Sequence, residues 1–151
     1  MYKNSKKEHI YMIIELEAII LSYCDNILEI VKNIKEYENI ISKYGKLFNI
    51  KTTDKIIIDE DLKYLKGVHT IDLWGCNKIT DKGLEYLKGV HTINLSCCYG
   101  ITDKGLEYIK GVHTINLTWC NQITDKGLKY LKGVHTIDLY NCDKITDKGL
   151  E

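Results

Sequence analysis

The sequence contains no proline and no arginine, and both absences limit what the protein can bind. All 21 basic residues are lysines, and 21 acidic residues balance them. Without arginine the chain lacks the side chain that reads guanine and phosphate in bidentate geometry. Because nucleic-acid partners also select a basic face, we expect no nucleic-acid partner. The lack of proline excludes a proline-rich linker between domains.

The sequence also lacks the patterns of a membrane span, a secretion signal and the common enzyme sites. Its apolar stretch at residues 10–23 is interrupted by Glu15 and Glu17, whereas a membrane span needs about 20 mostly apolar residues. The sequence holds no glycine-rich phosphate loop, no catalytic triad and no Cys-x-x-Cys pair. We therefore expect no membrane association, no catalytic activity, no cofactor and no metal.

A unit of 22 residues runs four times through the second part of the chain. The four copies are residues 62–83, 84–105, 106–127 and 128–149. A fixed period of this length indicates a stack of identical units, each in contact with its neighbours only. In the second copy, Ile93 and Leu95 alternate with polar residues as in a half-buried strand, whereas Leu84 and Leu87 share one face of a helical turn. We expect an α/β solenoid with parallel strands on its concave side and short helices on its convex side.

The stretch from Val90 to Asp103 places apolar residues, one cysteine and a final Ile-Thr-Asp in a spacing that resembles the leucine-rich repeat, in its cysteine-containing subtype. All four copies hold a cysteine at the position that names the subtype, namely Cys76, Cys98, Cys120 and Cys142. The resemblance covers residues 57–151. It implies a leucine-rich repeat solenoid that works in protein–protein interaction, with a protein target on its concave face.

The recurring cysteines face the inside of the stack and indicate a reducing compartment. Stacked strands place equivalent atoms about 4.8 Å apart in a line, whereas a zinc site needs four ligands around one point. We therefore interpret these cysteines as a buried row of free thiols. Because disulfides form in oxidising compartments, we expect an intracellular, cytoplasmic protein, with the nucleus left open.

The first part of the chain has a different pattern, in which apolar residues recur at helical spacing. This spacing predicts three helices, at residues 10–23, 27–34 and 37–44. A strand is expected next, over residues 46–51, with Phe48 and Ile50 facing inward. The predicted domains are a small all-helical N-terminal domain over 1–45, an irregular entry repeat over 46–61, and four repeats over 62–151 without a C-terminal cap.

Residues 15–25 are similar to the core of an F-box, a helical motif that precedes leucine-rich repeats in the F-box family. The resemblance implies a substrate-recognition adaptor of a cullin-type ubiquitin ligase. The apolar face that would contact the small linker protein of such a ligase consists of Leu16, Ile19, Ile20 and Tyr23. The alternative is an interaction scaffold without a ligase link, whose N-terminal helices only shield the first repeat from water.

Only seven of the 22 positions vary among the four copies, and four of the seven follow the strand. These four positions bring large aromatic residues to a surface that has no core to fill, as is typical of interface anchors. The alternative for some of these rings is packing over neighbouring loops. The candidate target-binding residues, on the outward strand positions and the adjoining loop, are Thr70, Asp72, Trp74, Asn94, Tyr99, Asn116, Trp119, Asp138 and Tyr140.

Two further features of the repeats lead to expectations. His69 and its equivalents form a row in which every histidine has the same neighbours, so we interpret the row as structural rather than catalytic. The last copy is followed only by Leu150 and Glu151, without a polar cap. Because repeat arrays need capped ends for solubility, we expect an open apolar end. The alternatives are that the sequence is a fragment of a longer array, or that a partner or a second copy of the chain covers this end.

Overall fold

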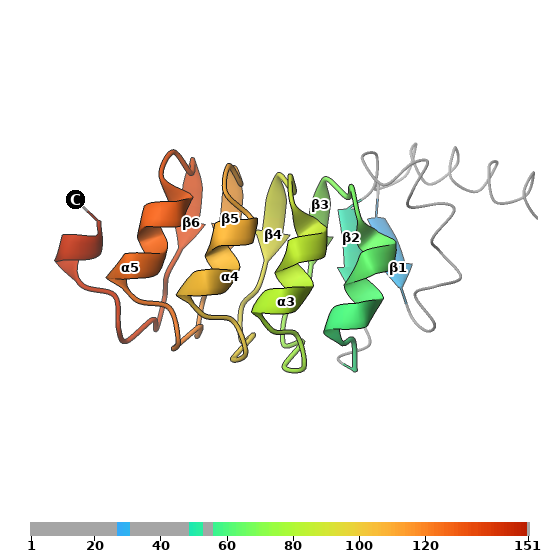
Figure 1. The fold of residues 1–151 in the computed structure, drawn as a ribbon, viewed down its shortest axis with the longest axis horizontal. Helices are drawn as coiled ribbons and strands as arrows, with labels where there is room; N and C mark the ends of the chain where they lie inside the picture. The colour runs from blue at the N-terminus through green and yellow to red at the C-terminus, as the bar shows by residue number, and fades with distance from the viewer. Residues whose placement is uncertain (1–26, 31–48, 53–55, 151) are drawn as a thin grey trace, which may run out of the picture.

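Strands line one side of the molecule and short helices line the other (Figure 1). The computed structural model of the chain describes residues 27–30, 49–52 and 56–150. Six parallel strands form one sheet in chain order: β1 (Ile27–Ile30), β2 (Asn49–Thr52), β3 (Thr70–Asp72), β4 (Thr92–Asn94), β5 (Thr114–Asn116) and β6 (Thr136–Asp138). The helices are α3 (Asp81–Leu84), α4 (Asp103–Tyr108) and α5 (Asp125–Leu128), with 3-10 helices at Asp59–Leu65, Glu85–Leu87, Lys129–Leu131 and Asp147–Gly149. The expected α/β solenoid is confirmed.

The solenoid begins earlier than the sequence predicted. The helix expected over residues 27–34 is wrong in its first half, because Ile27–Ile30 forms strand β1. Ile27 lies opposite Asn49 in β2, and this separation of 49 − 27 = 22 residues is the period of the repeats. A short apolar run fits a strand as well as a helix, and parallel pairing with β2 decides for the strand. The other two predicted helices lie outside the described residues.

The entry repeat also contains the expected strand, at slightly different bounds. β2 covers Asn49–Thr52, where residues 46–51 were predicted. Ile50 is buried as predicted, and Thr52 is buried beside it. Phe48 lies outside the described residues. A residue of β2 pairs with one 21 positions later in β3, since Asn49 lies opposite Thr70, so the entry repeat is one residue shorter than the others.

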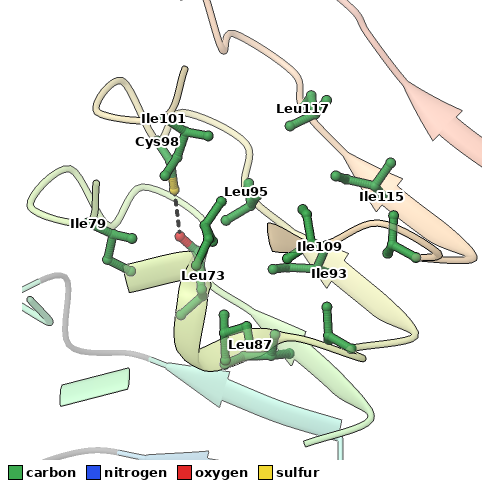
Figure 2. Close-up of a cluster of buried hydrophobic side chains, with 14 of the residues drawn as sticks. Leu73, Ile79, Leu87, Ile93, Leu95, Cys98, Ile101, Ile109, Ile115 and Leu117 are labelled. Atoms are coloured by element: carbon green, nitrogen blue, oxygen red, sulfur yellow. Dashed lines mark hydrogen bonds between the residues drawn. The ribbon is translucent and has the colours of Figure 1, made fainter. Parts of the chain in front are cut away.

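Equivalent apolar residues of successive repeats fill the space between sheet and helices. In the second copy, Leu84, Leu87, Ile93 and Leu95 are at most 1% exposed. Figure 2 shows how the inward residues of neighbouring repeats, such as Ile93 and Ile115, lie one behind the other. No repeat encloses its own apolar residues, so each depends on its neighbours for burial.

The cysteine row is buried and hydrogen-bonded between repeats. The thiol of Cys98 donates to the carbonyl oxygen of Leu73 in the preceding repeat, at 3.2 Å (Figure 2). Equivalent bonds run from Cys120 to the Leu95 carbonyl at 3.1 Å and from Cys142 to the Leu117 carbonyl at 3.0 Å. Burial raises the pKa of the Cys120 thiol to about 12, and it raises the pKa of the Cys98 thiol as well. These thiols therefore stay protonated and serve as donors.

Each α-helix starts at a Thr-Asp-Lys-Gly sequence, which also joins neighbouring repeats. Thr102 is the N-cap of α4, because its Oγ1 accepts a hydrogen bond from the backbone N of Lys104 at 3.3 Å. The backbone N and the Oγ1 of Thr102 donate in turn to the two carboxylate oxygens of Asp81 in the preceding repeat, at 2.8 and 2.6 Å. A Cβ on Gly105 would lie against this carboxylate and 3.1 Å from Leu84 Cδ1. We call these contacts the Asp–Thr pairs; the others are Asp59–Thr80, Asp103–Thr124 and Asp125–Thr146.

The four repeat histidines form a stacked row beside the strands. The ring centroids of His69, His91, His113 and His135 are 4.4 to 4.6 Å apart, with ring planes within 14° of parallel. Each Nδ1 lies 3.1 to 3.3 Å from the Oγ1 of the threonine that follows it. Partial desolvation and the charges of His91 and His135 lower the pKa of His113. The row is thus built into the stack, as expected from its uniform neighbours.

The last described repeat presents an apolar end. Val134 and Ile137 are only partly buried against the core, and Leu150 is 64% exposed. With Leu128 and Leu131 they line a hollow of about 640 Å³. The apolar surface expected at this end is therefore present in the described part of the chain.

The Asp–Thr pairs predict that Gly105→Ala destabilises the protein. In an ordinary helix this change raises stability by roughly 0.5–1 kcal/mol. Here the new Cβ would meet the Asp81 carboxylate, and overpacking of this kind costs about 1–3 kcal/mol. Urea unfolding should therefore show a lower midpoint for Gly105→Ala, whereas Lys104→Ala at the neighbouring exposed position should shift stability by less than about 0.5 kcal/mol. A raised midpoint for Gly105→Ala would contradict the role of the glycine.

The histidine row predicts a loss of stability in mild acid. Because the pKa of His113 is lowered from 6.5 in the folded state, the unfolded state binds more protons once the pH falls below that value. Stability contributed by this group is thus present above pH 6.5 and is lost as the pH falls through the folded-state pKa. An NMR titration should place the midpoint of His113 below 6.5, and His91→Gln should move it upward by removing one neighbouring charge. An unchanged midpoint in His91→Gln would refute coupling along the row.

Candidate partner-binding surface

A shallow groove of about 430 Å³ runs along the outward face of the sheet, the face opposite the helices. Five of the predicted target-binding residues line it, namely Thr70, Asp72, Asn94, Asn116 and Asp138. Further lining residues are Asn49 and Lys51 of β2, which the sequence prediction missed, and the threonines Thr92, Thr114 and Thr136. These threonines are the equivalents of Thr70 in the other three repeats. Their outward position on a strand follows from the same two-residue alternation that placed Thr70.

Asp72 and its equivalents have a structural task as well as a place in the groove. The Oδ1 of Asp72 accepts a hydrogen bond from the backbone N of Trp74 at 3.0 Å. The same bond is made by Asn94, Asn116 and Asp138 to the residue two positions later. It closes the turn that ends each strand. Aspartate and asparagine both provide the side-chain oxygen that accepts this bond, so either residue can close the turn. The position is uncharged in the two middle repeats and acidic in the two outer ones.

The other four predicted residues lie outside the groove, in the turns that follow the strands. Trp74 is 52% exposed, Tyr99 51%, Trp119 44% and Tyr140 68%. We call these four residues the aromatic strip. Each repeat contributes one ring to it, and none of the four is buried in the core. The predicted site therefore divides into a polar groove on the sheet and an aromatic strip beside it.

The backbone of these turns is left-handed at one position, which the sequence analysis missed. The φ angle is 72° at Gly75, 61° at Cys97, 64° at Trp119 and 55° at Asn141. The left-handed conformation costs a residue with a Cβ roughly 1–2 kcal/mol, and glycine and asparagine adopt it most readily. Gly75 and Asn141 could therefore have indicated a left-handed backbone at this position from the sequence alone. Tryptophan does not favour this conformation, so Trp119 gave no such indication.

The turn that carries Trp119 bears a second energetic cost. The backbone N of Trp119 donates to the carbonyl of Tyr140 at 3.0 Å, and the N of Asn121 donates to the carbonyl of Trp119 at 3.0 Å. The side-chain oxygen of Asn121 is buried, however, and has no hydrogen-bond partner among the described residues. Backbone strain and unpaired polar atoms gather at functional sites more than elsewhere. Both features cost stability, so the stability of the fold does not explain why Trp119 and Asn121 occupy this turn.

Tyr99 is the member of the strip with a perturbed hydroxyl. Negative charge at the sulfur of the neighbouring Cys97 raises the pKa of Tyr99. A tyrosine hydroxyl is protonated at neutral pH with or without this shift, and it can donate a hydrogen bond. Cys97 itself is partly exposed. The pair adds a polar contact to the apolar ring face.

The remaining expectations concern metal ions, the membrane and the ligase contact. In the described part of the chain, no group of three or more His, Cys, Asp or Glu residues is arranged to hold a metal ion. None of the helices among the described residues is both long and apolar enough to cross a membrane. The predicted linker-contact residues, Leu16, Ile19, Ile20 and Tyr23, lie outside the described residues.

Comparison with known proteins agrees with this architecture. A family model described as Leucine Rich repeat matches residues 68–88, 90–110 and 112–132. No curated protein is significantly similar to the chain in sequence. Among solved structures, the chain is similar to one in the crystal structure of the Rad7 and Elc1 complex in yeast, with a TM-score of 0.57 and 13% sequence identity. That match covers 68% of this chain and 31% of the other, so this chain spans about a third of its length.

At 13% identity the structural likeness shows the fold alone. The family match covers three successive units, and the same units supply strands β3, β4 and β5 and helices α3, α4 and α5. The chain carries leucine-rich repeats and folds as a leucine-rich repeat solenoid.

Proposed function

We propose that the protein is a protein-recognition module, which holds its target on the groove and the aromatic strip. The observation that carries the proposal is the strip itself, where four large rings are 44% to 68% exposed along one line of turns. Aromatic residues surrounded by polar ones are the usual anchors of protein interfaces. Leucine-rich repeats are interaction modules in general, and repeat solenoids present extended binding surfaces of this kind.

The groove suits this function because its middle is polar and uncharged. Thr92, Asn94, Thr114 and Asn116 line it without a formal charge, and Asp72 and Asp138 mark the outer repeats. Uncharged polar side chains lose less hydration energy than charged ones when a partner covers them. The groove can therefore lie under a protein segment whose anchoring contacts are made on the strip.

Site-specific photo-crosslinking in the source cells tests this proposal. A photoreactive amino acid in place of Thr92, in the groove, should yield adducts with one or a few proteins. The matched control is the same amino acid in place of Tyr86, which is 37% exposed on the helical side, and it should yield none of these adducts. Adducts that form from position 86 in place of position 92 would contradict the proposed binding face.

We propose further that the recognition module serves a cullin-type ubiquitin ligase as its substrate adaptor. The support is the F-box similarity of residues 15–25, together with a structural neighbour that was crystallised as a two-protein complex of Rad7 with Elc1. Strand β1 begins the sheet at Ile27, and the residues assigned to the linker contact all precede it. The alternative function is an interaction scaffold in which the N-terminal residues only cover the first repeat.

Co-elution with the purified linker protein of cullin ligases separates the two functions. The full chain should form a complex with it in size-exclusion chromatography, and the double change Ile19→Asp and Ile20→Asp should abolish the complex. Trp74→Ser, in the turn after strand β3, should leave the complex intact. If the unaltered chain elutes apart from the linker protein, the adaptor function is wrong and the scaffold stands.

A further inference from the structure

A row of lysines accompanies the histidine row in the loops that lead into strands β3 to β6. Each of these loops has the sequence Lys-Gly-Val-His, which contains no acidic residue. The lysines and three of the four histidines are exposed, whereas His91 is half-buried. We call these eight residues the basic rim; they are Lys66, Lys88, Lys110, Lys132, His69, His91, His113 and His135.

The basic rim borders the groove on the outward face of the sheet. The Nδ1 atom of His91 lies 3.2 Å from the Oγ1 of Thr92. His113 and Thr114 make the same contact at the same distance. Because both threonines line the groove, the side chains of a protein segment held there can reach the imidazoles.

The contact with threonine leaves each imidazole able to gain a proton. A threonine hydroxyl can donate to a neutral Nδ1 or accept from a protonated one, so the contact is possible in both states. Within the described part of the chain, the Nε2 atoms of His91 and His113 make no hydrogen bond. In the protonated ring this atom becomes a charged donor, for which a carboxylate is a strong acceptor.

The interactions within the row oppose its protonation, and an acidic partner would relieve this opposition. The charges that act on His113 are those of His91 and His135, and with partial desolvation they lower its pKa. A carboxylate placed beside the rings offsets this repulsion. Because binding and protonation are linked reciprocally, an acidic ligand raises the pKa of the row and binds more tightly to the protonated row.

On the helical side of the rim, the glutamates are already engaged. Glu85 pairs with Lys88 at 3.3 Å, and Glu107 pairs with Lys110 at 3.1 Å. The other two lysines of the rim have no ion pair among the described residues. The rim therefore keeps fixed positive charge beside the imidazoles.

On the sheet side, the groove is uncharged next to the two middle imidazoles. The strands of the two middle repeats carry Asn94 and Asn116 in the groove. Asp72 and Asp138 hold this position in the outer repeats, where each accepts a hydrogen bond from the backbone of its own turn. An acidic segment that crosses the groove at the middle repeats therefore meets amides and imidazoles, and no carboxylate of the sheet opposes it.

We propose that the basic rim binds an acidic segment of the partner protein and holds it more tightly in mild acid. This inference rests on the proposed protein-recognition function and adds the charge of the recognised segment. In mild acid imidazoles gain protons while aspartate and glutamate remain ionised. A nucleic acid is the less suitable anion, because the chain has no arginine and its charges balance.

Isothermal titration calorimetry of the full chain with a blocked hexaglutamate peptide tests the inference. The affinity at about pH 5.5, where imidazoles are protonated, should exceed that at about pH 8 by roughly fivefold or more, as one or two exposed ion pairs supply. Blocked hexaglutamine, the uncharged control, should bind at neither pH. Hexaglutamate that binds no better in acid, or no better than hexaglutamine, would overturn the proposal. Binding of an oligothymidylate and not of hexaglutamate would overturn it in favour of a nucleic acid.

An NMR titration of the unaltered chain gives a second readout that needs no variant. Saturating hexaglutamate should raise the protonation midpoint of His113 above its value in the free chain, because the bound carboxylates stabilise the charged ring. Hexaglutamine should leave the midpoint unchanged. A midpoint that hexaglutamate does not move would show that the peptide does not bind at the row.

Variants separate the titrating charges of the rim from its fixed ones. The double change His91→Gln and His113→Gln should reduce the affinity ratio between the two pH values to less than about twofold. Lys132→Gln should weaken binding at both pH values by a similar factor. Lys126→Gln is the matched control at the start of helix α5, outside the rim, and it should bind as the unaltered chain does. An unchanged affinity ratio in the double histidine variant would refute the row as the acid-responsive site.

Two outcomes separate this inference from the function on which it rests. If hexaglutamate fails to bind while crosslinking from position 92 still captures a protein, the acidic segment is wrong and the recognition function stands. If both experiments fail, the recognition function is wrong as well.

Discussion

The hydrogen-bonded pair of Asp81 and Thr102, repeated between neighbouring repeats from Asp59 to Thr146, is the contact on which the geometry of this part of the stack depends. The carboxylate accepts both the backbone N and the hydroxyl of the threonine, at 2.8 and 2.6 Å. The same threonine caps the next helix, so the start of each helix is placed by the repeat before it. These bonds also lower the pKa of Asp125 in the last pair, which keeps that carboxylate charged. Because the two partners are 21 residues apart in every pair, an inserted residue would break the contact.

This constraint explains why so much of the repeat was readable from the sequence. Alternation placed Ile93 and Leu95 on the inner face, and the period placed one cysteine per repeat in a buried row. The sequence also shows a glycine in the first turn of each α-helix, such as Gly105, where glycine weakens the helix. The reason for this glycine could not be predicted, because the Asp81 carboxylate that fills the space beside it comes from the preceding repeat. The sequence of the repeats shows the period of 22 residues but not the contacts that each repeat makes with its neighbours.

The errors at the N-terminal end have the same origin. Ile27–Ile30 was predicted as part of a helix, since its apolar residues fit both periods over so short a length. The strand is decided by the pairing of Ile27 with Asn49, which is a contact between segments and not a local preference. The register of 22 residues was the signal that could have identified it. The left-handed turn was missed for a related reason, as Trp119 and Cys97 give no local indication of a conformation that Gly75 and Asn141 adopt readily.

Some positions of the repeat serve stacking, and others are available for recognition. The second kind are positions where the side chain can change without moving the backbone. At the left-handed position the backbone N of Gly75, Cys97 and Trp119 donates to the next repeat at 2.9 to 3.0 Å whatever the side chain. The stack therefore holds the turn in place and leaves the side chain free to vary. A glycine or asparagine there serves the stack best, so the tryptophan costs stability that the array must offset elsewhere. A residue that stacking disfavours and that stands 44% exposed is best explained by a contact outside the array. For this reason Trp119, rather than the more exposed Tyr140, is the residue of the strip for which the case for recognition is strongest.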